Sequence, residues 1–248
     1  MSALPPSMLP PSMLPPSVLP PSVLPTGPMV NVGSGPASPA GWINIDGSAQ
    51  AWFAGHPVLA RVATFLTGRQ VGQWPSGVVY RDVRRGLGFP PASVAVVFSS
   101  HFAEHLYRDE ALAFLRDAHR ALLRRGVLRV IVPDAAAIVD WYLERRSQPP
   151  AGQLEASSDV LMGLLGVRAR QRTAGRGLLG LYRRLTDFDT HKWMYDADGL
   201  VALFREAGFA DPAPRKHLDS AIPREALAAV ERPDRIDDGA GVCVEARR

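Results

Sequence analysis

Short apolar runs alternate with helical patterns along most of the chain. The apolar runs predict strands over residues 29–32, 42–45, 78–80, 94–99, 127–132 and 241–245. Helical patterns cover residues 109–123, 135–145 and 198–207, and in the first of these Leu112, Leu115 and Leu122 share one face. Strands that alternate with helices favour a mostly parallel sheet, so the pattern predicts an α/β domain.

The first 28 residues follow a different pattern. LPPSM occurs twice and LPPSV twice over residues 4–23, and 10 of the 23 prolines lie within residues 1–28. Paired prolines fix φ and remove backbone donors, so neither helix nor sheet can form there. The sequence predicts a disordered, Pro-rich tail at 1–28 and a domain at 29–248. The tail is either a ligand for a proline-recognising module or a repeat upstream of a true start at Met29.

Composition narrows the class of protein. The 248 residues are 46% hydrophobic and 21% charged, which suits one globular domain with a tail. A single Cys excludes a disulfide framework and a multi-thiolate zinc site, and favours a cytoplasmic location. Of the 28 cations, 26 are Arg, a bias typical of GC-rich genomes, so the pI of 9.6 is weak evidence for nucleic-acid binding. No apolar run approaches the length of about 18 residues that a membrane span requires.

A glycine-rich loop follows the first predicted strand. Gly33-Ser34-Gly35 would let a backbone approach a ligand closely, although a simple turn has the same pattern. A dinucleotide fingerprint would place a third Gly at Ser38 and an acid about 20 residues on. Asp46 instead ends the second strand 11 residues after Gly35, which disfavours NAD. Its carboxylate could accept both hydroxyls of a ribose, or it could be a turn residue.

The connection between the first two predicted strands is unusually short. Residues 34–41 are too few for the helical crossover of about a dozen residues that joins parallel strands. Either this crossover is a bare loop or the second strand is misplaced.

Three blocks together resemble a known family. They are NVGSGPASPAGWINIDGS, the run VVYRDVRRGLGFPPASVAVVFSSHFAEHLYRDEALAFLRDAHRALLRRGVLRVIVPD, and HKWMYDADGLVALFREAGF. They are similar to class I methyltransferases that use S-adenosylmethionine (SAM), specifically the bacterial methyltransferase type 11-like group. The resemblance implies a Rossmann-like sheet flanked by helices, with SAM at the carboxyl ends of the strands. It also implies methyl transfer to oxygen, or alternatively nitrogen, of a small-molecule or saccharide-type acceptor.

The resemblance assigns roles to individual residues. It implies that Asp46 holds the ribose, that Asp82 lies near the adenine, and that the remaining cofactor contacts come from Asn31, Gly33, Ser34, Gly35, Ser99 and Ser100. The chain departs from the family where Val94 and Ala95, rather than an acid, follow Ser93. It departs again at residues 124–127, where the family has Lys-Pro-Gly-Gly.

Methyl transfer requires alignment of the acceptor and, at most, a base. His101 follows the pocket serines and is the first candidate base, although it could instead bond local backbone. His191 is the second candidate. Predicted substrate contacts are His105, Asp134, Trp193 and Tyr195; for these, packing, helix capping and core anchoring are the alternatives. His101 and His105 lie four residues apart, but no third ligand accompanies them at a convincing spacing, so no metal site is predicted.

Residues 148–190 interrupt the alternation and predict an insertion on the substrate side of the sheet. Six arginines in it could hold an anion or RNA: Arg168, Arg170, Arg172, Arg176, Arg183 and Arg184. Aromatic residues for base stacking are sparse, so nucleic acid is disfavoured. The alternatives to a small-molecule methyltransferase are an inactive binding protein of the same fold and an RNA methyltransferase that uses these arginines.

Overall fold

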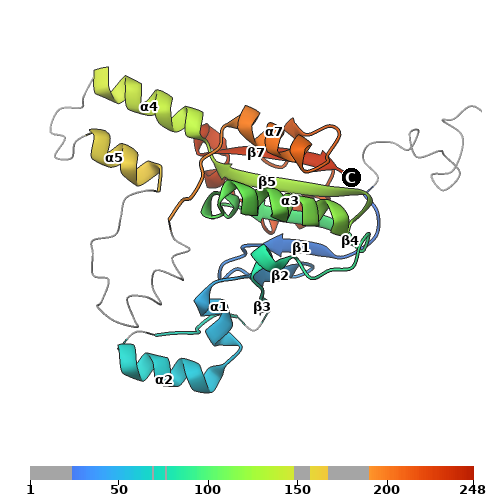
Figure 1. The fold of residues 1–248 in the computed structure, drawn as a ribbon, viewed down its shortest axis with the longest axis vertical. Helices are drawn as coiled ribbons and strands as arrows, with labels where there is room; N and C mark the ends of the chain where they lie inside the picture. Colours follow the sequence, from blue (N-terminus) through green and yellow to red (C-terminus); the bar gives the residue numbers. More distant parts are fainter. Residues whose placement is uncertain (1–23, 69, 76, 148–156, 167–189) are drawn as a thin grey trace, which may run out of the picture.

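The computed structural model describes residues 24–68, 70–75, 77–147, 157–166 and 190–248. Within them the centre of the molecule is a seven-stranded sheet of order β3-β2-β1-β4-β5-β7-β6 (Figure 1). The strands are β1 (Met29–Val32), β2 (Ile43–Asp46), β3 (Val78–Tyr80), β4 (Val94–Ser100), β5 (Leu122–Pro133), β6 (Ala213–Pro214) and β7 (Gly241–Arg247). Among these strands, β7 runs antiparallel to both β5 and β6, and the other neighbouring pairs are parallel. The predicted α/β class, a mostly parallel Rossmann-like sheet, is confirmed.

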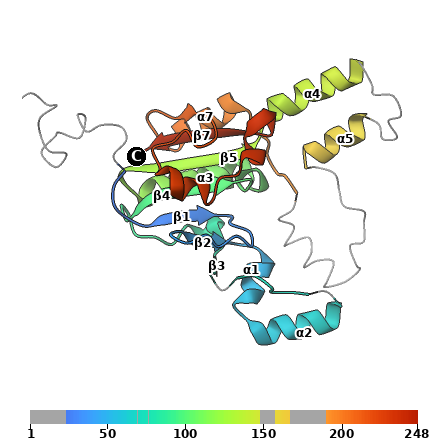
Figure 2. The same ribbon diagram turned by 180° about the vertical axis from the view of Figure 1, so that it is seen from behind.

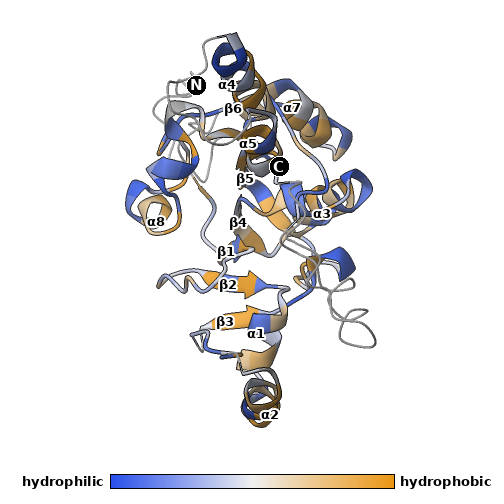
Figure 3. Cartoon of the chain, turned by 90° about the vertical axis from the view of Figure 1, so that its left-hand side faces the viewer, coloured by the Kyte–Doolittle hydropathy of each residue, from blue (hydrophilic) through white to orange (hydrophobic). Residues whose placement is uncertain are grey.

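Helices cover both faces of the sheet. The helices are α1 (Ala49–Ala54), α2 (Pro57–Thr67), α3 (Arg108–Ala121), α4 (Ala135–Ser147), α5 (Ser157–Leu164), α7 (Ala197–Glu206) and α8 (Arg224–Ala228). Figure 3 shows α3 and α7 on one side of the strands and α8 on the other. Figure 2 gives the view from behind.

Two clusters of buried side chains account for these layers. Val97 of β4 packs with α3 and α7, whereas its neighbours Val96 and Phe98 pack with Ile222 and Leu227 on the opposite face. Successive side chains of a strand point to opposite faces. A strand in a sheet that is covered on both faces therefore needs apolar residues at almost every position, and most positions of β4 are apolar.

Most predicted elements are present, with shifted ends. The strand predicted at 42–45 begins and ends one residue later, and that predicted at 127–132 begins at Leu122. Leu122 pairs with Val94 before a register shift, so the chain leaves α3 and enters the sheet without a turn. The helix predicted to 123 therefore ends at Ala121. α1, α2, α5, α8 and the two-residue β6 were not predicted.

The short crossover between β1 and β2 is a bare loop, as one of the two alternatives required. The strands are parallel neighbours, and no helix lies between them. Gly33 and Gly41 take φ of +67° and +82°, conformations that favour glycine. Below the loop, the buried Asn31 amide donates to the Asn44 side chain at 3.0 Å, and the Asn44 amide donates to the carbonyl of Trp42 at 3.1 Å. These bonds hold the loop ends together without a helix.

The described chain begins before the predicted domain boundary at 29. Leu24 packs against the core, and the backbone N–H of Ala95 donates to the carbonyl of Pro28 at 2.8 Å. The LPPS repeat and the six arginines of the predicted insertion lie outside the described residues. Among the described helices, none is long and apolar enough to cross a membrane.

Candidate active site

A cavity of about 240 Å³ lies at the carboxyl ends of four neighbouring strands. Its walls come from the ends of four strands and from Trp74: Gly33 and Gly35 after β1, residues 46–48 after β2, residues 81–84 after β3, and His101, Phe102, His105 and Leu106 after β4. In the sheet, β2 and then β3 lie on one side of β1, whereas β4 and then β5 lie on its other side. The cavity therefore lies at the point where strand order reverses, the usual ligand site of an open α/β sheet.

The glycine loop forms one wall of this cavity. Gly33 has φ of +67°, and a Cβ there would lie 2.7 Å from the ring of Phe102. Gly35 has φ of +59°, and a Cβ there would meet nothing within 4 Å. Gly33 is therefore required by close packing, whereas Gly35 leaves its backbone open toward the cavity.

Asp46 ends β2 and joins the loop to the next helix. Its carboxylate is buried and accepts the backbone N–H of Gly35 at 3.0 Å and that of Ser48 at 2.8 Å. Each carboxylate oxygen has two lone pairs, so these bonds leave acceptor capacity for a ligand. The two interpretations of Asp46, as a turn residue and as a ribose acceptor, are physically compatible.

Asp82 also lines the cavity, but its carboxylate is already occupied. The guanidinium of Arg84 donates to it twice at 2.8 Å, and the Arg84 N–H donates at 3.1 Å, which caps a short 3-10 helix (Val83–Arg85). The hydrogen bond from the Arg84 side chain lowers the pKa of Asp82. Its position beside an adenine stays a prediction.

Four predicted cofactor residues do not line this cavity: Asn31, Ser34, Ser99 and Ser100. Asn31 bonds Asn44 under the loop, as described above. The Ser34 hydroxyl donates to the carbonyl of Gly35 at 3.1 Å. The Ser99 hydroxyl is fully buried and bonds no described group. Their predicted contacts with SAM stay predictions.

His101 lines the cavity in a strained conformation. Its φ is +51°, its N–H donates to the carbonyl of Ile131 at 2.8 Å, and its Nε2 lies 3.3 Å from the carbonyl oxygen of Arg235. Burial, together with the charge of Arg235, lowers the pKa of His101 to about 4. The imidazole is therefore neutral at pH 7, as a base requires, and its Nδ1 carries the lone pair.

Glu104 was not predicted as a site residue, yet it lies at the centre of a buried cluster. Its side chain is 1% exposed, and neither carboxylate oxygen has a hydrogen-bond partner among the described residues. Burial raises the pKa of Glu104 to about 8. His105 Nε2 lies 3.9 Å from Glu104 Oε1, and the rings of His105 and His191 are 5.0 Å apart.

Backbone bonds bring His191 to this cluster. The N–H groups of Lys192 and Trp193 donate to the carbonyl of Glu104 at 2.7 and 3.2 Å. One ligand atom each from Glu104, His105 and His191 lie within 4.8 Å of one another, close enough to hold a metal ion. The sequence signal that could have found Glu104 is its place between two histidines in His101-Phe102-Ala103-Glu104-His105.

The other predicted substrate residues lie beside the cavity wall and do not line it. Asp134 accepts the N–H groups of Ala136 and Ala137 at 2.9 and 3.4 Å, so it caps α4. Tyr195 is 3% exposed, with a buried hydroxyl that bonds no described group, and burial raises its pKa to about 12. Trp193 is 46% exposed.

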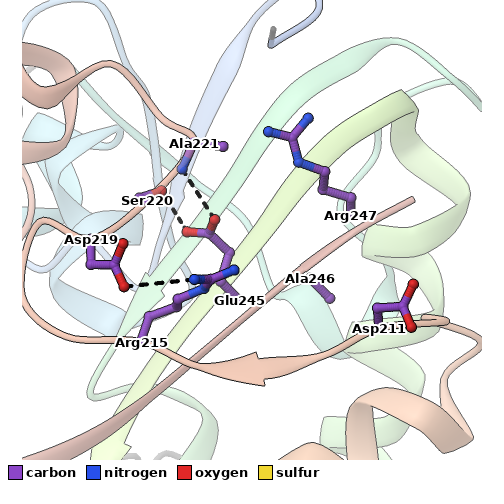
Figure 4. A pocket seen from close by; sticks show the side chains of 8 residues that line it. All are labelled: Asp211, Arg215, Asp219, Ser220, Ala221, Glu245, Ala246 and Arg247. Carbon is purple, nitrogen blue, oxygen red and sulfur yellow. Dashed lines mark hydrogen bonds and ion pairs between the residues drawn. The ribbon is translucent and has the colours of Figure 1, made fainter. Parts of the chain in front are cut away.

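A larger cavity of about 480 Å³ lies elsewhere, along β7 (Figure 4). Three of its charged side chains, Arg215, Asp219 and Glu245, interact with groups of the same cavity. Arg215 lies 3.6 Å from Asp219, and Glu245 accepts the hydroxyl of Ser220 at 2.5 Å and the N–H of Ala221 at 3.3 Å. None of the predicted site residues lines it.

No protein-family model and no curated protein matches the chain. Among solved structures, a SAM-dependent methyltransferase from Thermotoga maritima, described as a possible histamine N-methyltransferase, is 16% identical, with a TM-score of 0.43 over 91% of this chain and 84% of that one. A SAM-dependent methyltransferase from Archaeoglobus fulgidus is 14% identical, with a TM-score of 0.44 over 90% and 86%. The mitomycin 7-O-methyltransferase is 16% identical, with a TM-score of 0.41 over 90% of this chain and 49% of that one. These values describe a remote likeness of overall shape and assign no residue of this chain a role.

Proposed function

We propose that the protein is a SAM-dependent methyltransferase and that the cavity at the ends of β1 to β4 binds SAM. One observation carries the proposal. The glycine loop, Asp46 and the segment after β4, which follow three different strands, meet in one cavity at the reversal of strand order. That is where nucleotide-like ligands bind in open α/β sheets.

The residues present fit the cofactor. When bound, SAM supplies a methyl group on a positively charged sulfur. Gly35 leaves room for a ligand beside its backbone, and Asp46 keeps lone pairs for two hydroxyls. Arg81 and Val83 flank Asp82 in the lining of the cavity, and His101 and Phe102 line it from the segment after β4.

The acceptor in this proposal is an oxygen, or alternatively a nitrogen, of a small molecule or saccharide. His101 accepts the acceptor's proton through Nδ1, because the carbonyl of Arg235 holds the proton on Nε2. His191 does not line the cavity, but its ring lies 5.0 Å from that of His105, which does, so its part in catalysis stays a prediction. The two alternatives, an inactive binding protein and an RNA methyltransferase, are not favoured. The arginines on which the second would depend lie outside the described residues and carry no argument. The single, buried Cys243 fits the cytoplasm.

Calorimetric titration of the full chain with SAM, S-adenosylhomocysteine and NAD tests the proposal. We expect one-to-one binding of both adenosyl ligands and none of NAD. Asp46→Ala should abolish binding, whereas Asp211→Ala, a carboxylate of the larger cavity, should leave it unchanged. A folded wild-type chain that binds neither adenosyl ligand would refute the proposal, as would an Asp46→Ala variant that binds like wild type.

A further inference from the structure

Four ionisable side chains gather at the wall of the cavity that follows β4, and we call them the Glu104 cluster: His101, Glu104, His105 and His191. The first three belong to one turn of chain after β4, which includes a 3-10 helix (Ala103–His105). His191 joins them from the segment before α7, held there by backbone bonds to Glu104. The proposed methyl transfer uses His101 but gives Glu104 no task.

The carboxylate of Glu104 is buried, and its oxygens have no hydrogen-bond partner among the described residues. Two imidazole nitrogens lie near Oε1: His101 Nδ1 at 3.7 Å and His105 Nε2 at 3.9 Å. Both distances are longer than those of hydrogen bonds. Burying such a group costs free energy unless something else binds it.

The rings of the three histidines are held in a similar way. In each, one ring nitrogen lies near a backbone carbonyl oxygen: His101 Nε2 at 3.3 Å from Arg235, His105 Nδ1 at 3.4 Å from Thr190, and His191 Nδ1 at 3.0 Å from Leu165. A carbonyl only accepts, so that nitrogen carries the proton and the other carries the lone pair. Metal-binding histidines are held in this way, with the second nitrogen donating to a carbonyl or carboxylate.

We propose that the Glu104 cluster is a binding site for one divalent transition-metal ion, of which Zn²⁺ is the representative, with Glu104, His105 and His191 as ligands. Two imidazoles and a carboxylate form a donor set that suits zinc and leaves a position open. Hard cations such as Mg²⁺ and Ca²⁺ prefer all-oxygen sites. The ligand atoms lie within 4.8 Å of one another, and zinc would draw them to about 2.0–2.2 Å from a common centre by side-chain rotation.

The ion would lie in the wall of the cavity that His101 and His105 line. It would also join the turn after β4 to the segment before α7. The sequence predicted no metal because the two histidine ligands, His105 and His191, lie far apart along the chain and only the fold brings them together. The inference stands on the cluster alone and does not depend on SAM binding.

Zinc binding to the full-length, untagged chain tests the site. The protein is stripped with EDTA and titrated with Zn²⁺ against a chromophoric chelator, without SAM, and its metal content is measured by mass spectrometry. We expect one equivalent. Glu104→Gln and His191→Ala should each weaken binding at least about 100-fold, because the loss of a second-shell partner alone costs about 10–100-fold. His56→Ala, on an exposed histidine that stacks on Trp52, should bind like wild type.

Cobalt(II) provides a second readout, because its visible absorption reports the donor atoms directly. The spectrum of the wild-type complex should be lost in His191→Ala and kept in His56→Ala. Circular dichroism confirms that each variant is folded; if Glu104→Gln does not fold, His105→Gln replaces it. A folded wild-type chain that binds no zinc would overturn the proposal. So would a ligand variant that binds like wild type, or a loss in His56→Ala equal to that in His191→Ala.

Discussion

Arg129 in β5 is 0% exposed, and all five of its N–H donors are used. Two donate to Glu231 at 2.5 and 3.0 Å, and one donates to Glu245 at 3.0 Å. The other two donate to the carbonyls of Lys216 and Asp219 at 2.8 and 2.9 Å. One guanidinium thus joins β5 to residues 216–231, the segment that covers the face of the sheet opposite α3 and α7. Truncation of Glu231 should therefore be among the most damaging single changes.

The magnitude follows from what Glu231→Ala would leave behind. Burial alone would lower the pKa of Arg129, but the Glu231 hydrogen bond and nearby negative groups outweigh it and raise the pKa, so the guanidinium stays charged. In the variant, Glu245 would be the only carboxylate still bonded to the buried guanidinium of Arg129 among the described residues. The N–H of Leu218 would also lose its acceptor. Breaking a buried ion pair by removing one partner costs about 3–5 kcal/mol. In a chain of this size that loss corresponds to a Tm decrease of roughly 6–20 °C.

Urea unfolding followed by circular dichroism measures this loss, with an unchanged slope as evidence that two-state behaviour holds. Glu231→Gln should cost less than Glu231→Ala, because the amide oxygen still accepts. The matched control is Arg232→Ala, the neighbouring residue, whose ion pair with Asp234 at 2.7 Å is exposed to solvent. It should unfold like wild type. Equal stability of Glu231→Ala and Arg232→Ala would refute the reasoning.

Two further predictions concern single small residues. Gly33→Ala should destabilise the fold by at least about 1–2 kcal/mol, because φ is +67° and the added methyl group would meet Phe102. The control is Gly163→Ala, in α5 with open space around it, which should be neutral or stabilising in the same thermal melt. Equal melting of the two variants would contradict this. Burial raises the pKa of Cys243 to about 12, so iodoacetamide at pH 8 should label it only after unfolding. Since the unfolded thiol loses its proton at lower pH than the folded one, stability should fall as pH rises above about 9, less so in Cys243→Ala. Labelling at equal rates in native and denatured protein would be incompatible with burial.

The sequence by itself determined the class of fold and one wall of the site. Local runs of apolar and β-branched residues indicate strands, and β1, β3 and β4 begin where they were predicted. Glycines at positive φ and the acid that ends β2 are local features as well. Gly33, Gly35 and Asp46 line the same cavity, and their contacts with SAM stay predictions. The ends of α3 and β5 were less predictable, because pairing of Leu122 with Val94 overrides the helical pattern of Leu122.

Only the tertiary structure decided which polar side chains would face one another. In the sequence alone, Glu104 is a polar residue between two histidines, and Arg129 is a charged residue that interrupts an apolar run. Folding buries both: it surrounds the first with histidines from two segments and the second with carboxylates from two others. No periodicity in the chain encodes such pairs, because the free energy of a buried charge depends on partners that are close only in space.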